Sequence, residues 1–72
     1  MEIGTEWIQI AIENGGFMDL QRFGSEFSAR MRWRTGSVVL GSLCKTVAGA
    51  LNALDTALAE DAANEMIEKG VV

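Results

Sequence analysis

The stretch Phe17–Arg34, "FMDLQRFGSEFSARMRWR", decides the fold, because it sets the type of element in the middle of the chain. Its large apolar residues recur every three or four positions: Phe17, Leu20, Phe23, Phe27 and Met31. Such spacing lines one face of an α-helix. It predicts an amphipathic helix over residues 17–34 whose apolar stripe faces the core. Gly24 inside it costs about 1 kcal/mol relative to alanine, which indicates a kink or a close approach by another element.

A second apolar pattern follows the Thr35-Gly36 joint. It starts at Ser37, a plausible N-cap, and stops at Lys69 before Gly70, a residue type that ends helices. It therefore predicts a helix over residues 37–69, about 50 Å long. The stripe of this helix repeats every eleven residues, which is typical of nearly straight or slightly right-handed packing. Its members are Leu40, Leu43, Val47, Leu51, Leu54, Leu58 and Ala62.

The N-terminal segment permits two interpretations. Thr5 can cap a short helix that ends before Gly15, which predicts a helix over residues 5–14. The alternation of Ile8, Ile10 and Ile12 before an Asn-Gly pair is instead typical of a hairpin strand. A strand would need partners that the rest of the predicted chain does not offer. We therefore expect a helix and keep the strand as the alternative.

These segments together predict an all-α fold in a single domain of 72 residues. The expected arrangement is a helical hairpin or small bundle. A chain this short buries only about 60% of the surface that its unfolded form exposes, and here no disulfide or zinc site can add stability. There is one cysteine, Cys44, and there is no histidine. The two short helices cannot cover the long one, so we expect oligomerisation or a partner to complete the core.

Cys44 and the N-terminus bear on the compartment. An unpaired cysteine inside an apolar run favours a reducing environment, and the chain does not open with a basic segment followed by an apolar run. We therefore expect a cytoplasmic protein. Residues 37–54 resemble a membrane span with basic flanks, but Lys45 in the middle of the segment argues against insertion.

Charge divides the chain into three blocks. Residues 1–21 carry four acidic groups, residues 22–45 carry five basic groups and one acidic group, and residues 46–72 carry five acidic groups and one basic group. The net charges are −4, +4 and −4, which add to −4. The basic block is concentrated in a turn where a tryptophan stands among arginines: Arg30, Arg32, Trp33 and Arg34. We expect this basic turn to contact carboxylates, such as those of Glu60, Asp61 and Glu65 in a second copy.

The sequence contains few groups suited to catalysis. Cys44 has no histidine to activate it, and Lys45 follows Gly41 by four residues, which is not the spacing of a phosphate-binding loop. Asp61, Glu65 and Glu68 share a helix face and could hold a hard cation loosely, although a solvated acidic face is the simpler interpretation. We expect no enzymatic activity, no cofactor and no metal.

The sequence therefore predicts a protein-protein interaction or assembly module. It would be a homo-oligomeric structural subunit or a small inhibitor of a larger protein, and its size and acidity are typical of phage-like accessory proteins. The predicted interface is Leu40, Leu43, Val47, Leu51, Leu54 and Leu58, with Arg30, Arg32, Trp33 and Arg34 as a second, charged contact. The alternative is a nucleic-acid-binding or membrane-associated protein that uses the basic patch 30–34.

Overall fold

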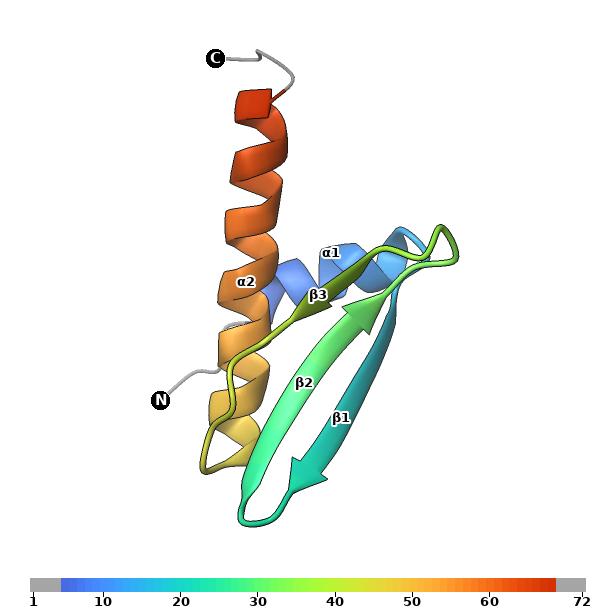
Figure 1. Ribbon diagram of the computed structural model, residues 1–72. Coiled ribbons are helices and arrows are strands. Elements are labelled where there is room, and N and C mark those ends of the chain that lie inside the picture. Colours follow the sequence, from blue (N-terminus) through green and yellow to red (C-terminus); the bar gives the residue numbers. More distant parts are fainter. Residues whose placement is uncertain (1–4, 69–72) are drawn as a thin grey trace.

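The computed structural model describes residues 5–68, with side chains up to residue 63. The element order is helix, three strands, helix (Figure 1): α1 (Glu6–Glu13), β1 (Phe17–Phe23), β2 (Glu26–Arg32), β3 (Val38–Leu40) and α2 (Val47–Glu68). The strands form one antiparallel sheet in the order β1-β2-β3. The predicted all-α helical bundle is therefore wrong, and the chain is a small fold of two helices and a sheet.

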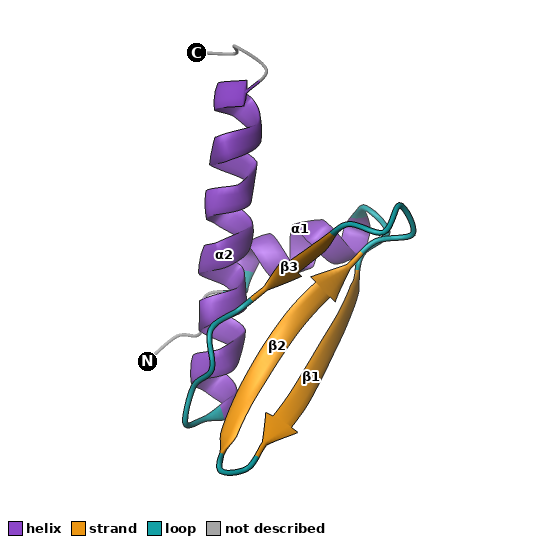
Figure 2. Ribbon diagram, viewed as in Figure 1, coloured by secondary structure: helices purple, strands orange, loops and turns teal. Residues whose placement is uncertain are grey.

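The molecule has two layers, because both helices lie on the same side of the sheet (Figure 2). The core between the layers combines residues of α1, β2 and α2: Ile8, Ala11, Ala29, Met31, Ala50, Leu54 and Leu58. Met31 and Leu54 are its largest fully buried side chains. The small side chains of Ala29 and Ala50 let α2 pack close to the central strand.

The decisive stretch forms a hairpin and not a helix. Gly24 has a φ of +64° and forms the two-residue connection Gly24-Ser25 between paired Phe23 and Glu26. Glycine with positive φ at the first position of a two-residue loop suits the twist of an antiparallel hairpin. The predicted kink within a helix is thus a strand reversal. Within β2 the side chains alternate, with Ala29 and Met31 buried against the helices.

The predicted apolar stripe is consequently divided between the two faces of the sheet. Cross-strand pairing places Phe17 beside Arg32 and Phe23 beside Glu26, on the side away from the helices. Phe27 packs against the core, whereas both other phenylalanines are exposed. The reversal at Gly24 changes which positions face inward, so a spacing of three or four residues does not keep these side chains together.

The predicted helix over 37–69 begins ten residues too early. Residues 38–40 form β3, which follows a turn at Gly36 with a φ of +95°. α2 begins at Val47, where the Thr46 hydroxyl caps the helix by accepting a hydrogen bond from the Gly49 backbone N–H at 3.0 Å. The N-cap is therefore Thr46 and not Ser37. The predicted stop at Lys69 and Gly70 lies outside the described residues.

The N-terminal helix is confirmed, and the strand alternative for residues 6–13 is excluded. Gly15 follows it with a φ of +90°, as expected for a residue that ends a helix. Thr5, however, does not cap the helix with its side chain. The cap comes from α2, where Oδ1 of Asp55 accepts hydrogen bonds from the backbone N–H of Trp7 at 2.8 Å and of Ile8 at 3.1 Å. No helix in the described part of the chain is long and apolar enough to cross a bilayer.

Candidate interaction surface

The side of the sheet away from the helices, here called the open face, is lined by alternate residues of all three strands. Between β1 and β2 the cross-strand pairs on this face are Phe17–Arg32, Asp19–Arg30, Gln21–Ser28 and Phe23–Glu26. Between β2 and β3 they are Arg30–Leu40 and Arg32–Val38. Four large apolar side chains on this face are exposed by about half or more: Phe17 (56%), Phe23 (53%), Val38 (48%) and Leu40 (65%). Neither helix covers them.

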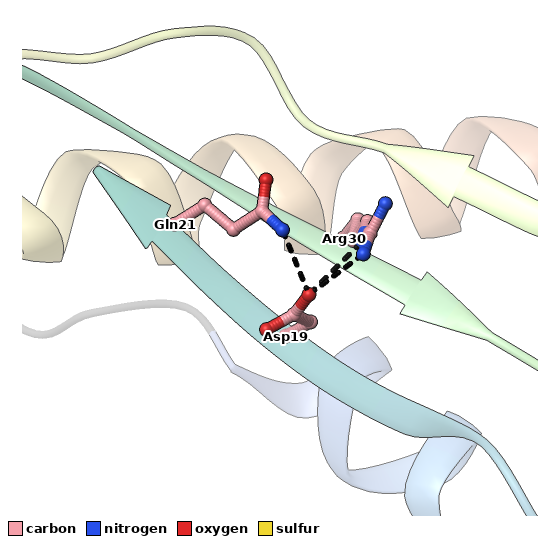
Figure 3. A network of polar contacts seen from close by, with 3 residues as sticks. All are labelled: Asp19, Gln21 and Arg30. Carbon is pink, nitrogen blue, oxygen red and sulfur yellow. Dashed lines mark hydrogen bonds and ion pairs between the residues drawn. The ribbon is translucent and has the colours of Figure 1, made fainter. Parts of the chain in front are cut away.

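A cross-strand ion pair occupies the centre of the open face (Figure 3). The guanidinium of Arg30 donates to Oδ2 of Asp19 from Nη2 at 2.8 Å and from Nε at 3.1 Å, and the side-chain amide of Gln21 donates to the same oxygen at 3.2 Å. Both charged side chains keep about a third of their surface exposed, so the pair contributes only about 0–1 kcal/mol to stability. Its main effect is to neutralise the middle of the face.

Strand β1 is an edge of the sheet. It is seven residues long, and among the described residues it pairs with β2 alone. Its backbone groups on the outer side therefore lack a strand partner. The strand has no proline or lysine, and its two charged groups are engaged locally. Asp19 pairs with Arg30, and Nε of Arg22 donates to the Gly24 carbonyl at 2.8 Å.

The other edge of the sheet is different. β3 is only three residues long, and α2 runs next to it (Figure 1). Beyond Leu40 the chain makes one further bridge to β2, in which Phe27 and Cys44 exchange backbone hydrogen bonds at 2.7 and 2.9 Å. A short, bent edge beside a helix is poorly suited to further strand pairing. Of the two sheet edges, β1 is therefore the one suited to pairing with another strand.

The basic turn lies at the end of the sheet where β1 begins. An open pocket of about 430 Å³ is lined there by Phe17, Arg32, Trp33, Arg34, Gly36 and Val38. Trp33 is half-buried and packs against the core, while Arg32 and Arg34 are exposed. Among the described residues the one ion pair is Arg30–Asp19, so neither Arg32 nor Arg34 is paired within that part of the chain.

Asp61 of α2 lies near the basic turn within the same chain. Asp61 lines a second open pocket, of about 300 Å³, together with Trp33, Thr35 and Ser37. Asp61 and Glu60 are exposed, and no ion pair joins either to a described arginine. The charge blocks suggested that the acidic end of one copy lies near the basic turn of another. Asp61 is already near the basic turn of its own chain. The side chains of Glu65 and Glu68 lie outside the described residues.

The six predicted interface positions do not form one stripe. Leu54 and Leu58 are buried in the chain's own core, and Leu51 packs against it. The other three are exposed and lie in β3, in the following loop and at the first residue of α2: Leu40, Leu43 and Val47. The structure instead groups Leu40 with Val38, Phe17 and Phe23 on the open face. Sequence reasoning missed the two phenylalanines because it assigned them to the core.

Chemical groups for a reaction are sparse. The described residues contain no cluster of three or more histidine, cysteine or carboxylate side chains that could hold a metal ion. Cys44 is half-buried, with its thiol 3.5 Å from the Ser42 carbonyl oxygen. The exposed apolar and aromatic surface is therefore the most distinctive feature of the molecule. No protein-family model matches the chain, and neither a curated protein nor a solved structure matches it.

Proposed function

We propose that the chain is a non-enzymatic assembly module that binds a second copy of itself through the open face and the free edge of its sheet. The observation that carries the proposal is the position of the exposed apolar side chains. Four of them lie on the one sheet face that no helix covers, and that face ends at an unpaired seven-residue strand. Phe17 and Val38 border one opening of this face, and exposed apolar surface rimmed by polar residues is typical of interaction sites.

The size of the core supports the same proposal. Seven apolar residues are buried among those described, and several of these are alanines. A domain this small gains only a few kcal/mol from its own core and is commonly stabilised by association. Phe17 and Phe23 already have almost half of their surface covered, so burial of the rest by a partner adds roughly 1–1.5 kcal/mol each from the hydrophobic effect. Association would therefore add buried apolar surface that the small core of a single chain does not supply.

The composition of the face favours a protein over a nucleic acid. Of its two arginines, Arg30 is neutralised by Asp19, which leaves Arg32 as the one unpaired base among its described residues. Affinity for nucleic acid rises with the number of phosphates that lysine and arginine neutralise. The paired charges leave the centre of the face nearly neutral, and Phe17 and Phe23 flank it on β1. Low net charge together with aromatic side chains is typical of protein interfaces.

Sedimentation velocity over a wide concentration range tests the proposal. Wild-type protein should sediment as a dimer or larger species at high concentration and dissociate on dilution. The double substitution Phe23→Ser/Leu40→Ser should give a folded monomer, since both side chains are exposed and leave the core intact. Leu43→Ser, an equally exposed position outside the sheet, is the matched control and should behave as wild type. A folded wild type that stays monomeric throughout would refute the proposal.

A second candidate is the binding of an anionic ligand, such as single-stranded nucleic acid, in the pocket at the basic turn. The observation that favours it is the pairing of two aromatic side chains with two arginines around one opening: Phe17, Trp33, Arg32 and Arg34. Aromatic rings stack on bases and arginines contact phosphates. Titration of labelled single strands in a salt series, with an Arg32→Ala/Arg34→Ala comparison, tests it. The same titration with anionic vesicles tests the membrane alternative.

A further inference from the structure

We infer that two copies join edge to edge, with β1 antiparallel to the partner's β1 and Leu20 opposite the partner's Leu20. This inference rests on the proposed function and specifies its geometry. It would extend the three-stranded sheet into a continuous one of six strands. Addition of a strand to a free edge satisfies backbone groups along its whole length and is a common mode of protein recognition.

Symmetry limits the possible registers. Two identical antiparallel strands related by a two-fold axis normal to the sheet must have a residue opposite itself, because side chains alternate between faces and opposed residues share a face. For the seven residues of β1, the three central choices are Asp19, Leu20 and Gln21. Only the register centred on Leu20 pairs all seven residues.

On the open face this register is self-complementary. Phe17 and Phe23 stand three residues on either side of Leu20, so each lies opposite the other in the partner, and two aromatic pairs form. Asp19 lies opposite the partner's Gln21. In each chain the bonds to Asp19 use Oδ2, which leaves Oδ1 to accept from the second N–H of the partner's amide.

On the helix side the same register joins exposed apolar groups. Leu20 and Met18 point towards the helix layer, yet both are about two-fifths exposed. α1 lies at the end of the sheet where β1 begins (Figure 1). Leu20 would meet the partner's Leu20. Met18 would meet the aliphatic part of the partner's Arg22, whose guanidinium is held at the Gly24 carbonyl. The two-fold axis places the two α1 helices at opposite ends of the joined strands.

The neighbouring registers are less favourable. Centring on Asp19 sets two carboxylates directly opposite each other, and like charges at opposed positions are destabilising. Centring on Gln21 places Asp19 opposite the partner's Phe23 and leaves Phe17 of each chain without a partner residue. Cross-strand aromatic pairs stabilise a sheet, and only the register centred on Leu20 forms them.

Disulfide trapping tests the register directly. In a Cys44→Ser background, single cysteines are introduced as Asp19→Cys, Leu20→Cys and Gln21→Cys, and folding of each is checked by circular dichroism. Opposed residues lie roughly 4.5–5.5 Å apart between Cα atoms, within disulfide reach, whereas diagonal neighbours lie about 7–8 Å apart. Under mild oxidation, Leu20→Cys should form a covalent dimer readily, and the other two should not.

Hydrogen exchange of the wild type supplies an independent measurement that needs no variant. Amides on the outer side of β1 should become protected as concentration rises, while those of α2 should not change. Association with efficient trapping at residue 19 or 21 instead would overturn the register. Association without protection of β1 would overturn the edge-to-edge arrangement and leave only self-association through the open face standing. Absence of association would remove both.

Discussion

Oδ1 of Asp55 in α2 lies 2.8 Å from the backbone nitrogen of Trp7 and caps the first turn of α1 across 48 positions of sequence. The same oxygen accepts from Ile8, so one carboxylate satisfies two backbone donors at a helix N-terminus. This contact fixes where α1 lies against α2, and it does so without any side chain from α1.

Asp55→Ala should therefore destabilise the fold by about 1–2 kcal/mol, the usual cost of removing a helix cap. Asp55→Asn keeps an oxygen acceptor and loses the charge, so its loss should be smaller. Urea unfolding at a single low protein concentration, followed by circular dichroism, measures both. Equal stability of the alanine variant and the wild type would mean that the cap contributes nothing.

Gly41, the residue after β3, packs tightly against the backbone of α2. A Cβ at this position would lie 2.9 Å from the backbone nitrogen and 3.0 Å from the Cα of Leu54, and both are rigid backbone atoms. Gly41→Ala should cost about 1–3 kcal/mol, as overpacking of a tight contact does. Ser42→Ala, at the exposed neighbouring residue, should change stability by less than about 0.5 kcal/mol. Similar unfolding midpoints for the two variants would contradict the tight contact.

The middle of the chain shows why the sequence misled. Apolar residues at positions 17, 20, 23, 27 and 31 fit a helical period, but the pair Gly24-Ser25 is also a two-residue hairpin turn, and the turn prevails. Once the chain reverses there, alternation in Phe27, Ala29 and Met31 becomes the relevant pattern. Residues spaced four apart also share one face of a strand, because strand side chains alternate with a period of two. The spacing from Phe27 to Met31 therefore fits a helix and a strand equally well.

The other boundaries were predictable to different degrees. The N-terminal helix and the glycine joints at 15–16 and 35–36 follow from local signals, and the structure confirms them as boundaries. The N-cap of α2 at Thr46 competes with an equally good capping residue at Ser37. The β-branched pair Val38-Val39 favours a strand after Ser37. The open face was not predictable, because it depends on the register between three strands.

The two exposed apolar residues Phe23 and Leu40 should respond differently to substitution. Phe23 lies in the proposed edge-to-edge contact, twice per dimer, whereas Leu40 lies in the strand at the opposite edge. Phe23→Ser should weaken dimerisation by about tenfold or more, since 1.4 kcal/mol corresponds to a factor of ten. Leu40→Ser should change the dimer Kd by less than about threefold. Analytical ultracentrifugation measures both constants, and a larger effect at Leu40 would favour face-to-face packing.

The arginines of the basic turn should not matter for self-association. Arg32 and Arg34 are exposed and unpaired among the described residues. Arg32 is the last residue of β2 and Arg34 lies in the turn after it, so neither belongs to β1, which makes the proposed contact. Arg32→Ala/Arg34→Ala should keep the wild-type dimer Kd within about threefold, because exposed charges contribute little to such contacts. A fully monomeric double variant would show that the basic turn, and not β1, supplies the main contact.

The most direct test of self-association through β1 is a sedimentation comparison between wild type and Leu20→Lys. In the proposed register this change sets two lysines opposite each other at the two-fold axis, where like charges and lost apolar contact both oppose pairing. Thr56→Lys adds the same charge at an exposed position on α2 and serves as the control. We expect wild type and Thr56→Lys to dimerise with rising concentration, and Leu20→Lys to stay a folded monomer. A Leu20→Lys protein that dimerises as tightly as wild type would contradict the account.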